Sequence, residues 1–141
     1  MATTRVPWMV VTVVVGLSLA GRAALAAEGQ VFDVQEQVKK GAPQPGFTYQ
    51  QMVTTPDYTV GVAAVKEEVK LHQHPDSDHN VYVVSGQGTI TVGSTQVSVK
   101  PGMLLYIPKG VPHGVKAAGG ELTLVDFSQP PFDPNKTEWI K

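Results

Sequence analysis

The four histidines of this chain are its best candidates for binding a metal ion. His72, His74 and His79 lie within one short stretch, and His113 follows much later. Side chains at positions i and i+2 of a strand share one face, so His72 and His74 would present two imidazoles side by side. Asp78 and the residues before it read as a turn, after which His79 would supply a third imidazole from the next strand. Neutral imidazole suits Zn, Cu, Fe and Ni.

Other kinds of active site find little support in the sequence. The chain has no cysteine, which excludes thiol nucleophiles, disulfides and cysteine-based zinc sites. No Ser-His-Asp arrangement with meaningful spacing and no phosphate-binding loop is present. Tyr82, Tyr106 and Asp126 lie near the histidines in the expected strands, and we interpret them as core or rim residues, because strand aromatics usually pack. A single histidine in a strand is more often structural than a metal ligand. The prediction of a metal site therefore depends on the four histidines lying in two groups.

Short strands separated by glycine and proline must position these side chains. The chain has 14 glycines and 11 prolines, and no helical pattern interrupts the apolar runs from Phe47 onward. This pattern predicts a single all-β domain, an antiparallel sandwich or barrel. A short helix or coil is expected within residues 31–40. The clearest predicted strands are residues 59–65, 69–74, 81–84, 89–92, 96–99, 103–107 and 121–127.

The spacing of the histidines resembles the two motifs of the cupin superfamily. The first motif, G-x5-H-x-H-x(3,4)-E-x6-G, is matched in spacing by His72, His74, His79 and Gly86. The second motif, G-x5-P-x-G-x2-H-x3-N, is matched by Gly102, Pro108, Gly110 and His113. The resemblance implies a cupin barrel (a double-stranded β-helix or jelly roll) over residues 47–127. It also implies a homodimer, which small cupins commonly form, and the metal ligands His72, His74, His79 and His113.

The chain departs from the cupin motifs at three positions. Lys66 and Ala117 replace a glycine and an asparagine that are not ligands in the motif. His79 stands where the first motif has its glutamate, and some similar small cupins use four histidines. Asp78 would keep a carboxylate in the site under the shorter spacing of the motif. We favour His79, because the downstream glycine fits Gly86 and a shift of one residue turns the side chain to the opposite face of the strand.

The function we expect is that of a metal-dependent enzyme, an oxidoreductase resembling the dioxygenases among the cupins, acting on a small organic molecule. The cofactor would be one divalent transition metal, with Mn, Fe, Cu, Ni and Zn all open. The alternative is a non-catalytic cupin that binds a metal or a small ligand, because four protein ligands close the shell of tetrahedral zinc. A weaker third hypothesis is an interaction scaffold without a metal. Apolar side chains would form the pocket wall, from Met103, Leu105, Ile107 or their alternating partners on the strand, with Tyr82 or Tyr106.

The flanking segments indicate export and a small remaining domain. Residues 1–26 combine Arg5, an apolar stretch and a small-x-small pattern at Ala24 and Ala26, which is typical of a Sec-type signal peptide. We therefore expect a periplasmic or secreted protein with no stable membrane association after cleavage. Residues 27–46 would form a lead-in, and residues 128–141 a tail along the outside of the barrel or a neighbouring subunit. The net charge of -1 gives no indication of a nucleic-acid partner.

Cleavage of residues 1–26 is the first testable prediction. Expression of the full chain in a host with Sec export should give a mature N-terminus near Ala27 or Glu28, read by intact mass spectrometry. A chain that begins at Met1 and stays in the membrane fraction would instead indicate an uncleaved anchor.

Overall fold

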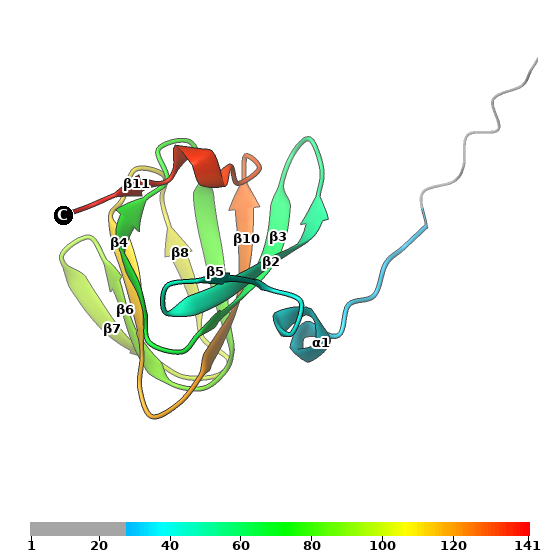
Figure 1. Ribbon diagram of the computed structural model, residues 1–141. Coiled ribbons are helices and arrows are strands. Elements are labelled where there is room, and N and C mark those ends of the chain that lie inside the picture. The colour runs from blue at the N-terminus through cyan, green and yellow to red at the C-terminus, as the bar shows by residue number, and fades with distance from the viewer. Residues whose placement is uncertain (1–27) are drawn as a thin grey trace, which may run out of the picture. The chain divides into compact units, whose positions relative to one another are not determined.

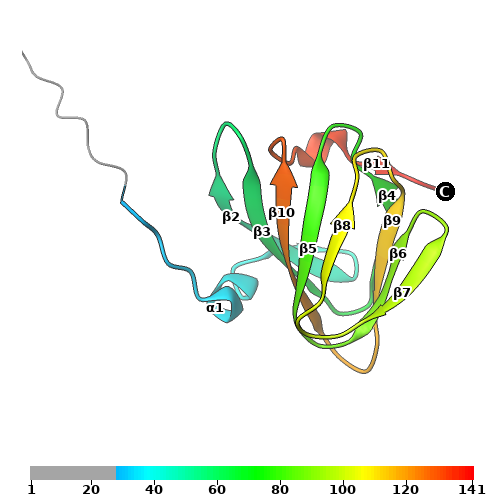
Figure 2. The ribbon, with the colours of Figure 1, turned by 180° about the vertical axis from the view of Figure 1, so that it is seen from behind.

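Two antiparallel sheets face each other in the computed structural model, which describes residues 28–141 (Figure 1). The first sheet has the strand order β1-β2-β3-β10-β5-β8, and the second has the order β11-β4-β9-β6-β7. Figure 2 shows the run from β2 to β8 of the first sheet. The elements are α1 (Val34–Val38), β1 (Ala42–Gln44), β2 (Phe47–Thr54), β3 (Thr59–Val65), β4 (Glu68–Gln73), β5 (Asp78–Ser85), β6 (Gly88–Val92), β7 (Thr95–Val99), β8 (Leu104–Ile107), β9 (His113–Ala117), β10 (Leu122–Gln129), η1 (Pro134–Lys136) and β11 (Glu138–Trp139).

The predicted all-β fold is confirmed, and the core explains why these residues form strands. On β5, His79, Val81 and Val83 are buried while Tyr82 is 45% exposed, which is the alternation of a half-buried strand. Aliphatic side chains from both sheets meet in between, and burial of each contributes roughly 1.5–3 kcal/mol. The largest of the fully enclosed apolar side chains are Val62, Val65, Val83, Ile90, Ile107 and Leu122.

The turn between β5 and β6 depends on Gly86. Its φ of 82° lies in the left-handed region that favours glycine. A Cβ at this position would also collide with the main-chain carbonyl of Glu121 at the start of β10. The backbone conformation and the close approach of Glu121 thus explain why the first cupin motif has a glycine here. Gly86 directly follows β5 and marks the end of that strand.

Three short strands, β1, β9 and β11, were not predicted from the sequence. β9 begins at His113 directly after Pro112, and β1 lies in a segment rich in glycine and proline. Both form because a neighbouring strand supplies hydrogen-bond partners, β4 and β6 for β9 and β2 for β1. The predicted signal, residues 1–26, lies outside the residues that the structure describes. Within residues 28–141, no helix is both long and apolar enough to cross a membrane.

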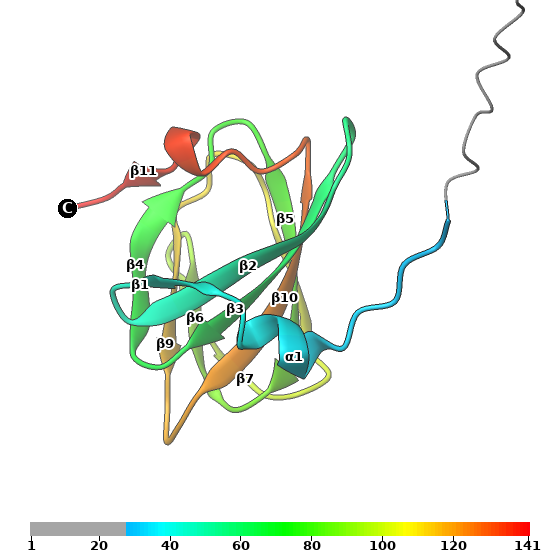
Figure 3. The ribbon, with the colours of Figure 1, turned by 45° about the vertical axis from the view of Figure 1, so that its right-hand side comes forward.

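The C-terminal tail does not follow the course that we expected. Instead of running along the outside, it crosses one end of the sandwich, where β11 pairs with β4 (Figures 1 and 3). The main-chain N–H of Ile140 donates to the carbonyl of Leu71 at 2.9 Å. Lys136 forms an ion pair with Asp76 at 2.7 Å. We refer to residues 130–141 as the C-terminal strap, because these contacts hold it across the opening between the sheets.

Candidate metal centre

Three histidines come together between the two sheets. His72 lies on β4, His74 directly follows that strand, and His113 begins β9. Each offers a ring nitrogen, and these three atoms lie within 4.8 Å of one another. Their side chains are buried, and the β4–β9 pairing sets His72 directly opposite His113 with ring centroids 4.3 Å apart. The structure therefore brings together three of the four histidines that the sequence singled out, in an arrangement that could hold a metal ion.

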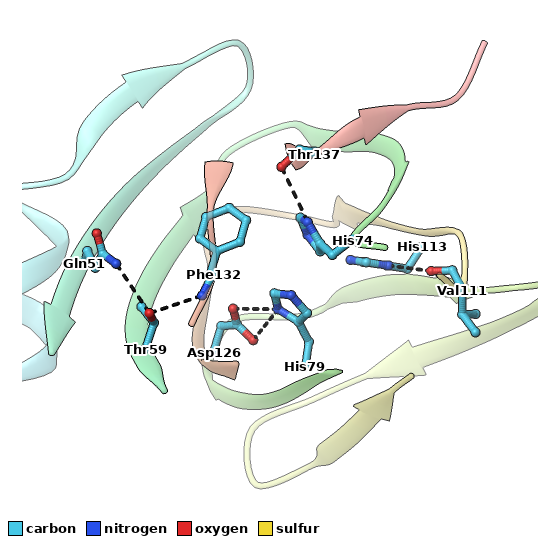
Figure 4. Close-up of polar contacts among 9 residues, drawn as sticks. All are labelled: Gln51, Thr59, His74, His79, Val111, His113, Asp126, Phe132 and Thr137. Atoms are coloured by element: carbon cyan, nitrogen blue, oxygen red, sulfur yellow. Dashed lines mark hydrogen bonds and ion pairs between the residues drawn. The ribbon is translucent and has the colours of Figure 1, made fainter. Parts of the chain in front are cut away.

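Main-chain carbonyls orient two of these rings. Nδ1 of His72 lies 2.7 Å from the carbonyl of Lys70. Nδ1 of His113 lies 2.9 Å from the carbonyl of Val111, a contact drawn in Figure 4. A carbonyl only accepts, so in each neutral ring Nδ1–H is the donor and Nε2 keeps its lone pair. Such a bond to the distal nitrogen is the usual way in which a protein fixes the tautomer and direction of a ligating histidine.

His79 lies beside this group and carries a different partner. Its ring stacks on that of His74, with centroids 4.3 Å apart and an interplanar angle of 27°. Its Nδ1 lies 2.8 and 3.0 Å from the two carboxylate oxygens of Asp126, so Nδ1–H is the donor (Figure 4). Its Nε2 is buried and has no hydrogen-bond partner. His79 is outside the set of three whose nitrogens lie within 4.8 Å, but it lines the same cavity.

Asp78, the alternative to His79, is used elsewhere. Its carboxylate accepts a hydrogen bond from the main-chain N–H of Lys109 at 2.8 Å, in the turn before His113. The side chain of His79 is 4% exposed and lines the cavity, whereas Asp78 is absent from the cavity wall. This is the alternation between faces that the sequence argument assumed.

Asp126 was expected in the core or at the rim, and its contact with His79 was missed. Asp126 lies on β10 opposite Val81, two residues before the strand partner of His79, Ser128. Asp126 and His79 are therefore diagonal neighbours on the inner face of the sheet, close enough for their side chains to meet. No motif marks this pair, because the two residues are far apart in the sequence and only the β5–β10 register brings them together.

Burial keeps the clustered imidazoles neutral. Desolvation lowers the pKa of His72, and it lowers that of His74 to about 2 and that of His113 to about 4. The neighbouring histidines add to the effect, since a second positive charge nearby is unfavourable. A histidine must be neutral to bind a metal, so the same desolvation keeps these rings in their ligand form well into the acidic range.

The histidines line a cavity of about 330 Å³ that is largely apolar. Ile107 contributes to its wall as expected, but Met103 and Leu105 do not, since they pack against the core. Tyr82 and Tyr106 are exposed instead, because their strand positions face outward. The strap adds residues that the sequence did not suggest, among them Phe132, Thr137 and Trp139.

The strap touches the histidines directly. The Phe132 ring lies edge-on to His74 at 5.0 Å between centroids, and Trp139 lies 5.1 Å from His72. Thr137 places its hydroxyl 3.4 Å from Nδ1 of His74 (Figure 4). The strap thus covers the candidate ligands on one side of the cavity.

Comparisons with known proteins agree with this architecture. Residues 60–127 match the family described as Cupin domain. An uncharacterized protein of Streptomyces coelicolor is 36% identical over 84 residues, which cover 58% of this chain and 80% of that protein. An uncharacterized protein of Methanocaldococcus jannaschii is 31% identical over 81 residues, 57% of this chain. The match spans 65% of the length of the archaeal protein.

Solved structures show the same fold at low sequence identity. KdgF from a Halomonas species superposes with a TM-score of 0.67 and 23% identity, covering 75% of this chain and 97% of that one. Pac13 of Streptomyces, described as a nucleoside dehydratase and also solved with uridine, gives a TM-score of 0.67 and 20% identity. That match covers 81% of this chain and 92% of Pac13. These likenesses show the fold. The match of residues 60–127 to the Cupin domain, with the relative at 36% identity, shows that the chain belongs to the cupin superfamily.

Proposed function

We propose that this cupin binds one divalent transition metal through His72, His74, His113 and His79, and that the metal form acts on a small organic molecule. The observation that carries the proposal is the group of buried imidazoles whose ring nitrogens lie close together. One nitrogen each from His72, His74 and His113 lies within 4.8 Å of the others, and the buried Nε2 of His79 adds an unpaired acceptor beside them. A buried acceptor without a partner costs about 1–3 kcal/mol, and coordination of a cation by His79 would remove that cost.

The surroundings fit a metal-dependent enzyme of the oxidoreductase, dioxygenase-like kind. When bound, a divalent transition metal supplies a Lewis acid and, for Fe, Mn or Cu, a redox partner. The protein supplies the substrate pocket and the orientation of the ligands. The apolar cavity wall excludes water and receives the carbon skeleton of a substrate. Asp126 holds the ring of His79 in place, and the carbonyls of Lys70 and Val111 do the same for His72 and His113.

The second candidate function is that of a binding module. Four imidazoles are a complete shell for tetrahedral zinc, which would make the site structural. The likeness to Pac13, which was solved with uridine, is compatible with small-molecule binding by this fold, but fold alone does not assign a ligand. The homodimer and the export of the protein stay predictions.

Dioxygen uptake distinguishes the two functions. Protein purified from its exporting host, with metal quantified by mass spectrometry, should consume dioxygen in the presence of some member of a panel of enolic and phenolic compounds. Uptake should stop when the metal is removed and in His113→Ala, with folding checked by circular dichroism. A protein that holds stoichiometric zinc, binds no small chelating anion and is inert towards the panel would support the binding module.

The ligand set predicts a ranking of variants in metal content. His72→Ala, His74→Ala and His113→Ala should each lose stoichiometric metal, because each removes a direct ligand, and His79→Ala should come close to this. Asp78→Ala is the matched control and should retain the metal, since its carboxylate binds the main chain of the next turn. Metal retained by His79→Ala and lost by Asp78→Ala would contradict the proposed set.

Asp126→Asn tests the support of His79 separately. This change keeps the size of the side chain but removes its charge, and loss of such an outer partner typically lowers metal affinity about 10–100-fold. Competition with a chromophoric chelator measures the affinity. Unchanged affinity would mean that His79 is not a ligand, even if the other three histidines are.

The lowered histidine pKa values predict acid lability of the metal-free protein. The unfolded chain takes up protons below a pKa of ~6.5, whereas folded His113 does so only near pH 4 and His74 near pH 2. Above pH ~6.5 these rings are neutral in both the folded and the unfolded chain. As pH falls below that value, protonation favours the unfolded chain, and the free energy of unfolding drops by about 1.4 kcal/mol per pH unit for each histidine until its folded pKa is reached. Urea unfolding with chelator between pH 7 and 5 measures it, and His113→Gln should lower the slope by one proton.

A further inference from the structure

A second buried polar atom in the cavity wall has no partner and no role in the proposed metal site. The hydroxyl of Tyr49 makes no hydrogen bond, although it is buried and its residue lines the cavity. Buried hydroxyls in folded proteins are almost always paired, so an orphan of this kind requires an explanation. A phenol without a protein partner that lines a cavity can pair with a ligand bound there.

The position of Tyr49 is built into the sheet. Tyr49 lies on β2 and its ring extends over Gly61 of β3, where a Cβ would overlap the hydroxyl. Gly61 lies opposite Asp126 of β10, which in turn bonds to His79 of β5. The four residues thus form a row across adjacent strands on the inner face of the sheet. The Tyr49 ring can occupy this place because Gly61 has no side chain.

The Tyr49 hydroxyl is suited to donate a hydrogen bond. Burial raises the pKa of the phenol, and the nearby carboxylate of Asp126 raises it further, so the proton stays on the oxygen throughout the physiological range. Both oxygens of Asp126 already accept from Nδ1 of His79. No acceptor among residues 28–141 pairs with the Tyr49 hydroxyl, so this donor is available to an acceptor that comes from outside the protein.

Phe132 of the C-terminal strap covers this part of the cavity. Its ring lies edge-on to Tyr49 at 5.7 Å and also contacts His74 and His79, at 5.0 and 5.8 Å between centroids. Its main-chain N–H donates to the hydroxyl of Thr59 at 3.2 Å (Figure 4). Beyond Phe132 the strap is held by the pairing of β11 with β4, the Ile140 hydrogen bond, an exposed ion pair and the contacts of Thr137 and Trp139 with the histidines, and none of residues 130–141 is fully buried. Segments with so few buried contacts open more readily than the core.

We propose that the Tyr49 hydroxyl is the specificity-determining donor for the ligand of this cavity, a small molecule with an apolar body and a carbonyl-type oxygen, which gains access by displacing Phe132. The apolar wall receives the body, through residues such as Phe47, Val65, Val81, Ile107 and Leu124. The tyrosine receives the oxygen. This inference deepens the proposed function and rests on it for the identification of the cavity as the substrate site.

Two probes of the same shape isolate this hydrogen bond. Cyclohexanone and methylenecyclohexane differ only in whether an acceptor oxygen is present. The full chain, as purified and after chelator treatment, is titrated with each probe by ligand-observed NMR, and the two dissociation constants are divided. In Tyr49→Phe the ratio of the cyclohexanone constant to the methylenecyclohexane constant should rise about tenfold, because one buried hydrogen bond is lost. The affinity for methylenecyclohexane should stay within about twofold.

The control is Tyr82→Phe, the same chemical change at an exposed position on β5. It should leave both dissociation constants unchanged. An unchanged ratio in Tyr49→Phe, an equal loss for both probes, or no binding of cyclohexanone to the unaltered chain would overturn the proposal. Metal content, measured on the same samples, separates this result from the proposed function. If the protein as purified contains no metal but shows the Tyr49 effect, the metal site alone is refuted, and if it contains metal but lacks the effect, the role of Tyr49 alone is refuted.

Discussion

Desolvation of several imidazoles at one place is the constraint on which the structure of the site depends. His72, His74 and His113 are each less than a tenth exposed, and their mutual proximity makes a positive charge on any of them unfavourable. Neutral rings must still pair their N–H groups inside the protein. The carbonyls of Lys70 and Val111 meet this need for two rings. Nε2 of each of these two rings then keeps its lone pair, which a cation could coordinate.

The fold supplies these partners from strands of both sheets. β4 and β9 lie side by side in one sheet and bring His72 opposite His113, while β5 and β10 pair in the other sheet and bring His79 diagonal to Asp126. Two glycines allow another part of the chain to approach the backbone closely. Gly86 ends β5 at the register that turns His79 inward, and Gly61 leaves room for the phenol of Tyr49. A one-residue slip in β5 would exchange His79 for Asp78 and remove the contact with Asp126.

The sequence was sufficient for the parts of this site that are local. Alternation placed His72 and His74 on one face, and the spacing to Gly86 favoured His79 over Asp78, whose carboxylate the structure finds bound to Lys109. Parts that depend on distant pairing were missed. Asp126 looks like any strand residue until β10 is set beside β5, and β9 looks like the end of a turn. The strap was misjudged because prolines and polar residues do not show which surface a segment will cross.

The contact between Asp126 and His79 also gives a physical reason for the departure from the cupin motif. The motif has a glutamate at position 79, whereas this chain has an imidazole there and a carboxylate directly behind it, on another strand. The negative charge is thus retained but moved outward by one ring, where it orients Nδ1 of His79 and leaves Nε2 free. A glutamate at position 79 would face Asp126 at close range in a buried site, and two carboxylates so placed cannot both ionise without cost. The two positions are therefore coupled, and a change at one of them would favour a compensating change at the other.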